Sequence, residues 1–290
     1  MAYTNYTKPY NSPADLVNRL SSNGLLFRDT RFAEKTLAQI NYYRFKIYLR
    51  PLCDRTNGCY KKNAYFENGL ELYRFDEELR SYLFRVISRI EIKLRNRLDQ
   101  VVSSNKNNPF WYLDNGLFLQ HKRFTAVNGL RQQLSSYFNG CRDDYAIHYK
   151  ENYFNDKNHD FKSLPPFWMV GELTTFGHLL TLYNSLDKAP FRIDARNNHL
   201  DHLANEFGAN NLNTLNVWLK SIRDIRNRCA HHNRVWNCNY RAPSRIINLL
   251  TIAPVNNNRL YSFIALLHHI SKSMGLDERV RLDISKLIHK

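Results

Sequence analysis

Residues 72–98, LYRFDEELRSYLFRVISRIEIKLRNRL, are the stretch that decides the fold class. Apolar side chains recur along it at intervals of three and four residues, which places them on one face of a helix. These side chains are Leu72, Phe75, Leu79, Leu83, Val86, Ile90 and Leu94. No glycine or proline interrupts the pattern. The stretch therefore predicts an amphipathic helix of about seven turns.

Helical spacing of apolar residues continues on both sides of this stretch, whereas alternating β-branched patterns are scarce. Further helices are predicted at residues 14–21, 33–48, 118–138, 168–186, 212–232 and 260–274. Residues 53–69 are expected to form a loop or short hairpin, and residues 140–163 an irregular segment. The expected fold is all-α. It forms a single helical unit over residues 1–290, with a helical N-terminal extension over about 1–70 and a core bundle over about 71–275.

The chain is strongly basic, with 42 Lys and Arg against 26 Asp and Glu and a formal net charge of +16. Most of the excess lies in residues 1–100 and 201–290. Core packing does not need this excess, and its self-repulsion opposes compactness. A polyanionic partner would relieve the repulsion, and nucleic acid is the commonest such partner. The charge favours RNA over an acidic protein partner, although a merely basic surface remains the simpler alternative.

The cysteines and the N-terminal sequence bear on the compartment. Five cysteines, an odd number without a Cys-x-x-Cys pair, are typical of a reducing compartment. The N-terminal residues are polar and lack the apolar core of a signal peptide. No segment approaches the roughly 18 apolar residues of a membrane span. We therefore expect a cytoplasmic protein with no membrane partner.

The helix predicted at residues 212–232 has two distinct faces. On a helical wheel, an apolar group should face the core: Leu215, Trp218, Ile222, Ile225 and Cys229. A second group, polar except for Ala230, lies on the adjoining flank within an arc of about 140°: Arg223, Arg226, Asn227, Ala230 and His231. Guanidinium groups, an amide and an imidazole are thus expected at the rim of a buried surface.

These side chains suit the cleavage of RNA by its own 2′-hydroxyl group. When that hydroxyl attacks the adjacent phosphate, an enzyme needs only a group that moves protons and a cation that stabilises the developing charge. Histidine exchanges protons near neutral pH. Arginine binds phosphate oxygens in a fork and stabilises charge in the transition state. This chemistry requires no metal and no cofactor.

The same residues carry a family resemblance. The stretch Arg226-Asn227-Arg228-Cys229-Ala230-His231-His232 and the NRVWN that follows it resemble the signature of Abi-family abortive-infection proteins, in particular their AbiF/AbiD-like branch. That signature is a form of the Arg-x(4–6)-His motif of HEPN domains. Three more stretches resemble the family in the same order, so that the resemblance spans roughly residues 8–250. They are NYYRF at 41–45 with Tyr48, LYRFD at 72–76 through Arg89-Ile90-Glu91, and Phe167-Trp168 through Glu172 to Phe176-Gly177-His178.

The resemblance implies a helical HEPN-like bundle and a role in bacterial defence against phage, in an abortive-infection or toxin–antitoxin system. It implies a metal-independent endoribonuclease, latent until triggered, whose site is commonly completed by two copies of the domain. A homodimer is therefore expected. Carried onto this chain, the catalytic residues are Arg226, Asn227 and His231, with no metal and no cofactor.

Several alternatives remain open at this stage. Other pairs have the spacing of the motif but lie on no convincing amphipathic helix: Arg142 with His148, Arg192 with His199, and Arg196 with His202. His232 is an alternative end of the motif. Arg226 and His231 could also serve structure by closing the helix and pairing with acids such as Glu91 or Asp224. The protein could likewise hold a structured non-coding RNA without cutting it, or act as an adaptor between proteins.

Further residues are expected to bind RNA without taking part in catalysis. Arg85, Arg89, Lys93 and Arg97 repeat every four residues beside the apolar stripe of the long helix, and such like charges repel one another. This row predicts a track for phosphate groups, with a solvated face as the alternative. Near the motif, Arg223, Arg228 and Arg234 are expected to contribute. Some of the 18 Tyr and 17 Phe could stack on bases, although most should fill the core.

A metal site is the least favoured reading of the motif region. Its candidate ligands are Cys229, His231, His232 and Cys238. Their spacing fits a zinc site poorly, because paired zinc ligands usually lie two to four residues apart.

Overall fold

The computed structural model describes residues 4–7, 9–54, 56–120, 122–243, 246, 256, 258–276 and 279–289. Over these residues the chain forms twelve α-helices joined by loops and short 3-10 turns, and no β-strand beyond isolated bridges such as that of Cys53 with Tyr60. The all-α class is thus confirmed. Within the same described residues, no helix combines the length and the apolar character needed to cross a membrane. The chain divides into two compact units, Met1–Glu78 and Leu79–Lys290.

The N-terminal unit contains α1 (Pro13–Ser22), α2 (Thr30–Gln39), α3 (Tyr42–Leu49), a 3-10 turn (Arg50–Leu52) and the first turns of α4 (Phe66–Lys106). Helix α1 begins with a reciprocal cap, in which Ser12 and Asp15 each bond the other's backbone N–H. Helices α1 and α2 pack together. Their apolar sides and that of α3 bury Leu16, Leu20, Ala33, Phe45 and Phe66.

The single helix predicted at residues 33–48 is wrong, because the chain breaks between α2 and α3. Ile40 takes an extended conformation, with φ −109° and ψ 117°. The Asn41 side chain then accepts the backbone N–H of Tyr43 at 2.8 Å and opens α3 as an N-cap. Apolar spacing continues across the break, so the pattern alone did not reveal it.

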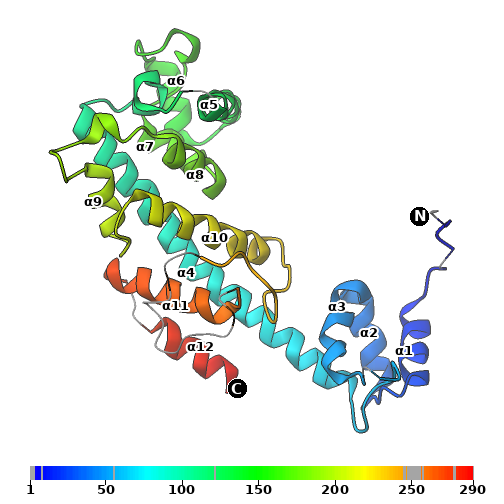
Figure 1. The fold of residues 1–290 in the computed structure, drawn as a ribbon. Coiled ribbons are helices and arrows are strands. Elements are labelled where there is room, and N and C mark those ends of the chain that lie inside the picture. The colour runs from blue at the N-terminus through cyan, green and yellow to red at the C-terminus, as the bar shows by residue number, and fades with distance from the viewer. Residues whose placement is uncertain are drawn as a thin grey trace. The chain divides into compact units, whose positions relative to one another are not determined.

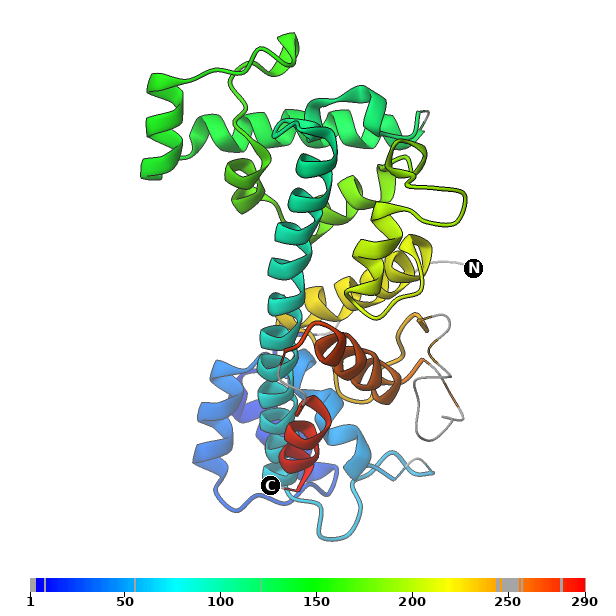
Figure 2. The ribbon, with the colours of Figure 1, turned by 90° about the vertical axis from the view of Figure 1, so that its left-hand side faces the viewer.

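The C-terminal unit is built on the remainder of α4, as Figures 1 and 2 show. The apolar stripe predicted from the sequence is buried from Leu79 onward, with Leu83, Ile90 and Leu94 fully covered. Helices α10 (Leu212–Ala230) and α11 (Leu260–Ser273) lie against α4 in both views. The other helices of the unit are α5 (Lys122–Gly140), α6 (Asp144–Asn152), α7 (Phe167–Val170), α8 (Phe176–Ser185), α9 (His199–Asn205) and α12 (Val280–Ile288).

Two further sequence expectations need correction in this unit. Residues 140–163 are not wholly irregular, because α6 forms there and buries Ala146 and Tyr149. The helix predicted at 168–186 is interrupted after Val170 by a 3-10 turn. Helix α8 then begins anew at a cap, where the Thr175 hydroxyl accepts the backbone N–H of His178 at 3.2 Å.

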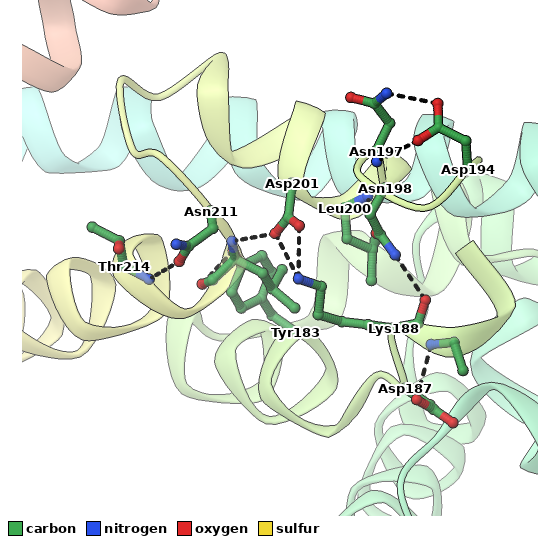
Figure 3. Close-up of polar contacts among 12 residues, drawn as sticks. Tyr183, Asp187, Lys188, Asp194, Asn197, Asn198, Leu200, Asp201, Asn211 and Thr214 are labelled. Carbon is green, nitrogen blue, oxygen red and sulfur yellow. Dashed lines mark hydrogen bonds and ion pairs between the residues drawn. The ribbon is translucent and has the colours of Figure 1, made fainter. Parts of the chain in front are cut away.

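The start of α10 is fixed by a network of polar contacts (Figure 3). The Asp201 carboxylate accepts the backbone N–H of Leu212 at 2.8 Å and the Lys188 ammonium at 2.7 and 2.9 Å. Asn211 caps the helix through its side chain, and the Tyr183 hydroxyl donates to the Leu212 carbonyl at 3.2 Å. Because a helix is stiff, anchoring its first turn also sets the position of its last turn.

Candidate functional site

Helix α10 has the two faces expected from its sequence. The five side chains of its predicted apolar face are each at most 6% exposed, which confirms that face: Leu215, Trp218, Ile222, Ile225 and Cys229. On the polar flank, Asn227 and His231 are exposed, whereas Arg223, Arg226 and Arg228 are half-buried. The burial of one face therefore holds the polar side chains of the motif at the surface.

The last turn of α10 ends in a Schellman motif. His231 is the C-cap residue, and His232 follows in the left-handed region with φ +55°. The His232 N–H donates to the Cys229 carbonyl at 3.1 Å, and the Asn233 N–H to the Arg228 carbonyl at 2.7 Å. These two bonds satisfy carbonyls that a helix end otherwise leaves unpaired. The backbone of His231 is thereby fixed.

A hollow of about 430 Å³ opens beside this turn. Three α10 side chains and the C-cap residue His231 line it together with four residues from the segment that follows: Asp224, Asn227 and Arg228, then Asn233, Asn239, Tyr240 and Arg241. The Asn227 and His231 side chains have no hydrogen bond or ion pair to any other described residue. Both are therefore available to a ligand in the hollow.

Arg228 lines the same hollow and also holds the segment that follows α10. Its Nη1 donates to the Arg234 carbonyl at 3.4 Å and lies 3.7 Å from the Cys238 sulfur. The guanidinium carbon is 5.4 Å from the centre of the Tyr240 ring, a cation–π contact. Arg228 thus brings a positive charge to the hollow while serving the local fold.

Arg226 faces α4 rather than the hollow. Its Nε lies 3.4 Å from the Glu91 Oε2 atom, and its guanidinium carbon is 5.5 Å from the centre of the Phe84 ring. The Glu91 side chain, only 9% exposed, also lies 3.6 Å from Arg95 Nη2. The pairing of Arg226 with Glu91, one part of the expected structural alternative, is therefore confirmed, whereas His231 pairs with no acid among the described residues. Arg226 is not among the described residues that line the hollow beside His231.

The row of basic residues on α4 divides into two halves. Arg85 and Arg89 are exposed and line a hollow of about 470 Å³ together with Arg279 and Asp283. The Asp283 carboxylate in this hollow accepts the hydroxyl of Tyr82 at 3.0 Å. This half of the row remains accessible to an anionic ligand.

The other half of the row is engaged within the protein. Lys93 donates to the Met274 carbonyl at 3.0 Å. Arg97 makes two bonds to the Glu206 carboxylate, at 2.8 and 2.7 Å, and these bonds raise the pKa of Arg97 above its usual value. The carboxylates of Glu206 and Asp283 lie far from α4 in the sequence, so no local signal could have revealed them.

The remaining candidates occupy less decisive positions. Arg223 lies on the polar flank of α10, where its Nη2 atom is 3.6 Å from the Oδ1 atom of its neighbour Asp224. Arg234, which follows the Schellman turn, is half-buried. Among the described residues, no three His, Cys, Asp or Glu side chains are grouped as they would be to hold a metal ion. Sequence reasoning missed three residues that line the hollow, Asn239, Tyr240 and Arg241, because no periodicity places an irregular segment against a helix.

The fold and the hollow define a helical protein with an Arg–His motif at the exposed end of a buried helix. Residues 35–237, well over half of the chain, match the family of Abi-like proteins, and this range includes the whole motif. The chain therefore belongs to the Abi-like protein family, which connects it with abortive-infection defence against phage. No match was found among curated proteins or among solved structures.

Proposed function

We propose that the chain is a HEPN-type endoribonuclease of the AbiF/AbiD-like branch, which cuts RNA in phage-infected bacteria. The observation that carries this proposal is the end of α10, where the unbonded Asn227 and His231 side chains line one hollow with Arg228. An imidazole, an amide and a guanidinium suit the charges and protons of phosphate transfer. Membership of the Abi-like family supports the defence role.

The proposed reaction uses the RNA's own hydroxyl group as the nucleophile. The 2′-oxygen forms a bond to the adjacent phosphorus, and the bond from phosphorus to the 5′-oxygen breaks. His231 moves a proton between these oxygens and the solvent, Asn227 donates a hydrogen bond to the phosphate, and an arginine stabilises the added negative charge. The products are a 2′,3′-cyclic phosphate and a free 5′-hydroxyl, and none of these steps requires a metal.

A homodimer explains how Arg226 takes part in this reaction. Within one chain Arg226 pairs with Glu91, away from the hollow that holds His231. A second copy that presents its Arg226 to the His231 hollow of the first would complete the site. Because Glu91 neutralises Arg226 in the single chain, the same contact keeps the enzyme latent until a partner or RNA phosphate displaces the carboxylate.

Mixing two inactive variants tests the shared site. Arg226→Ala and His231→Ala proteins should each lack cleavage activity, since each removes one half of the chemistry. After equal amounts are mixed and subunits exchange, about half of the dimers are mixed, and each mixed dimer has one intact site of two. Activity should therefore return to roughly a quarter of the wild-type level. Cleavage of a labelled RNA and light scattering on the same samples would measure this.

A control identifies the arginine that acts with His231. If Arg228 of the same chain does so, the Arg228→Ala protein should be inactive and should not complement the His231→Ala protein. Complete absence of recovered activity in a confirmed mixed dimer would refute the shared site. A strictly monomeric protein, with and without RNA, would refute it equally.

RNA binding should depend on the accessible half of the basic row on α4. Replacing Arg85 and Arg89 by Glu should weaken binding to many RNA sequences and reduce its salt dependence, because both side chains are exposed and add to the phosphate-binding charge. Binding isotherms at several salt concentrations measure both effects. Arg97→Gln is the matched control: Arg97 is committed to Glu206, so this change should lower thermal stability more than RNA affinity. Equal effects on RNA affinity would contradict the division of the row.

A second function, RNA binding without cleavage, has one observation in its favour. The arginine of the motif is neutralised by Glu91 and lies outside the hollow, so a single chain offers binding groups without the complete catalytic set. Such a protein would hold a structured non-coding RNA through its basic surfaces. The behaviour of the His231→Ala variant separates the two functions.

A further inference from the structure

The N-terminal unit carries a hollow lined with aromatic side chains, and none of its lining residues belongs to the motif or to the basic row. It measures about 1000 Å³, near the upper end of the range of about 300–1,000 Å³ typical for ligand pockets. Tyr6 and Tyr10 line it from the segment before α1, and Tyr42 and Tyr43 from the first turn of α3. Tyr6, Tyr10 and Tyr43 are 77%, 88% and 64% exposed. Aromatic rings gathered at the surface in this way mark a binding site more often than scattered ones do.

Three of the four tyrosines have side-chain interactions within the unit. The neighbouring Tyr43 side chain raises the pKa of the Tyr6 hydroxyl above its usual value. The rings of Tyr42 and Tyr43 meet edge to face, with centres 6.3 Å apart. The Lys46 ammonium lies 4.1 Å from the centre of the Tyr43 ring. The segment before α1 forms one wall of the hollow, because Tyr6 and Tyr10 line it together with Tyr42 and Tyr43 of the first turn of α3.

Charge and hydrogen-bonding groups indicate what this pocket binds. Arg19 lines it and, among the described residues, forms no ion pair, and no Asp or Glu is part of the described lining. The Gln39 amide, also in the lining, offers one donor group and one acceptor. Flat rings for stacking, an amide for a base edge and a cation for a phosphate are the three elements of a site for unpaired nucleotides.

We propose that this hollow binds unpaired bases of single-stranded RNA by stacking on Tyr10 and Tyr43, with Arg19 on the adjoining phosphate. A proline-rich peptide also docks on aromatic grooves, but it would gain nothing from Arg19 and Lys46 or from the net charge of +16. The inference rests on the proposed function in that RNA is the partner. It adds a site that selects unpaired over base-paired RNA.

Binding of the full-length protein to a short single-stranded 2′-O-methyl RNA with 2-aminopurine at one position tests this site, because that RNA resists cleavage. Tyr10→Ala and Tyr43→Ala should each weaken binding by roughly five- to a hundredfold, the range for losing one stacked base. The same changes should abolish the quenching of 2-aminopurine fluorescence that stacking causes in the wild-type complex. Tyr10→Phe and Tyr43→Phe keep the ring and should restore both readouts.

Four controls make the outcome decisive. Tyr153→Ala removes an exposed tyrosine (58%) of the other unit and should change neither readout. A double-stranded RNA, and an abasic strand of the same length, should bind wild-type and Tyr10→Ala proteins equally, because neither offers free bases. Circular dichroism would show that the variants are folded.

Unchanged binding and quenching in folded Tyr10→Ala and Tyr43→Ala proteins would overturn this inference alone, provided that the wild-type protein binds RNA. Displacement of the RNA by a proline-rich peptide, with the same dependence on both tyrosines, would overturn it in favour of a peptide site. A wild-type protein that binds no RNA at all would instead overturn the proposed function, and this inference with it.

Discussion

The His231→Ala protein is expected to lose RNA cleavage and to keep its fold. A histidine that moves protons contributes about 10²- to 10⁴-fold to rate, so cleavage should fall by at least about a hundredfold. The melting temperature should hardly change, because the side chain is exposed and has no bond to another described residue. Cleavage of an end-labelled RNA measures the loss. Wild-type cleavage should persist in EDTA, leave a 2′,3′-cyclic phosphate and fail on 2′-O-methyl RNA.

The neighbouring histidine supplies the matched control. His232→Gly removes the adjacent imidazole and keeps the left-handed backbone that the Schellman turn needs, since glycine adopts it without strain. This protein should cut RNA normally if His231 ends the motif. Loss of cleavage in His232→Gly but not in His231→Ala would make His232 the reactive residue. Full retention of cleavage and phage protection in His231→Ala would make the histidine structural.

Removing the Glu91 carboxylate is expected to be the most destabilising change at the site. Glu91 is buried between Arg226 and Arg95, so Glu91→Ala leaves two partly buried guanidinium groups without their common partner. Breaking a buried pair from one side costs about 3–5 kcal/mol. Because Arg226 is 26% exposed, we expect a somewhat smaller loss than this range, about 2–3 kcal/mol. Urea unfolding of wild-type and variant proteins measures the difference.

The chain contains a close comparison for this effect. Glu172 lies 3.4 Å from the same Arg95 but its side chain is 66% exposed, so Glu172→Ala should change stability by less than about 1 kcal/mol. A double-mutant cycle of Glu91→Ala with Arg226→Ala isolates their coupling, which should be clearly favourable. A Glu91 effect no larger than that of Glu172 would show that burial adds nothing to the pair.

Local periodicity predicted much of the fold and failed where a single polar side chain determines the end or the start of a helix. The apolar stripe from Leu79 to Leu94 and the buried face of α10 follow from spacing alone, because apolar residues recur at helical intervals over several turns. The break at Asn41 and the restart of α8 at Thr175 depend on capping bonds that interrupt an otherwise continuous apolar pattern. Helix α6 buries only Ala146 and Tyr149, too few positions to form a recognisable repeat.

The positions of Asn227 and His231 beside one hollow were predictable, because both lie at the end of the same helix. Arg226, which the helical wheel places on the same flank, turns instead toward Glu91 of α4. Their partners were not predictable to the same extent: Glu91 was one of two acids considered for Arg226, and the engagement of Arg97 by Glu206 joins residues more than a hundred positions apart. Ion pairs between distant segments follow from tertiary packing and leave no periodic trace in the sequence.

Helix α10 is fastened at both ends, by Asp201 and Asn211 at its start and by the Schellman turn at its finish. Helix termini usually fray, and their amide hydrogens then exchange with solvent through small local openings. Here such an opening must break bonds of the anchors as well as those of the helix itself. The amide hydrogens of the last turn should therefore exchange with solvent only through larger unfolding events. The imidazole of His231 is left with little freedom beyond rotation about its own side-chain bonds, which limits the orientational entropy it loses when a ligand binds in the hollow.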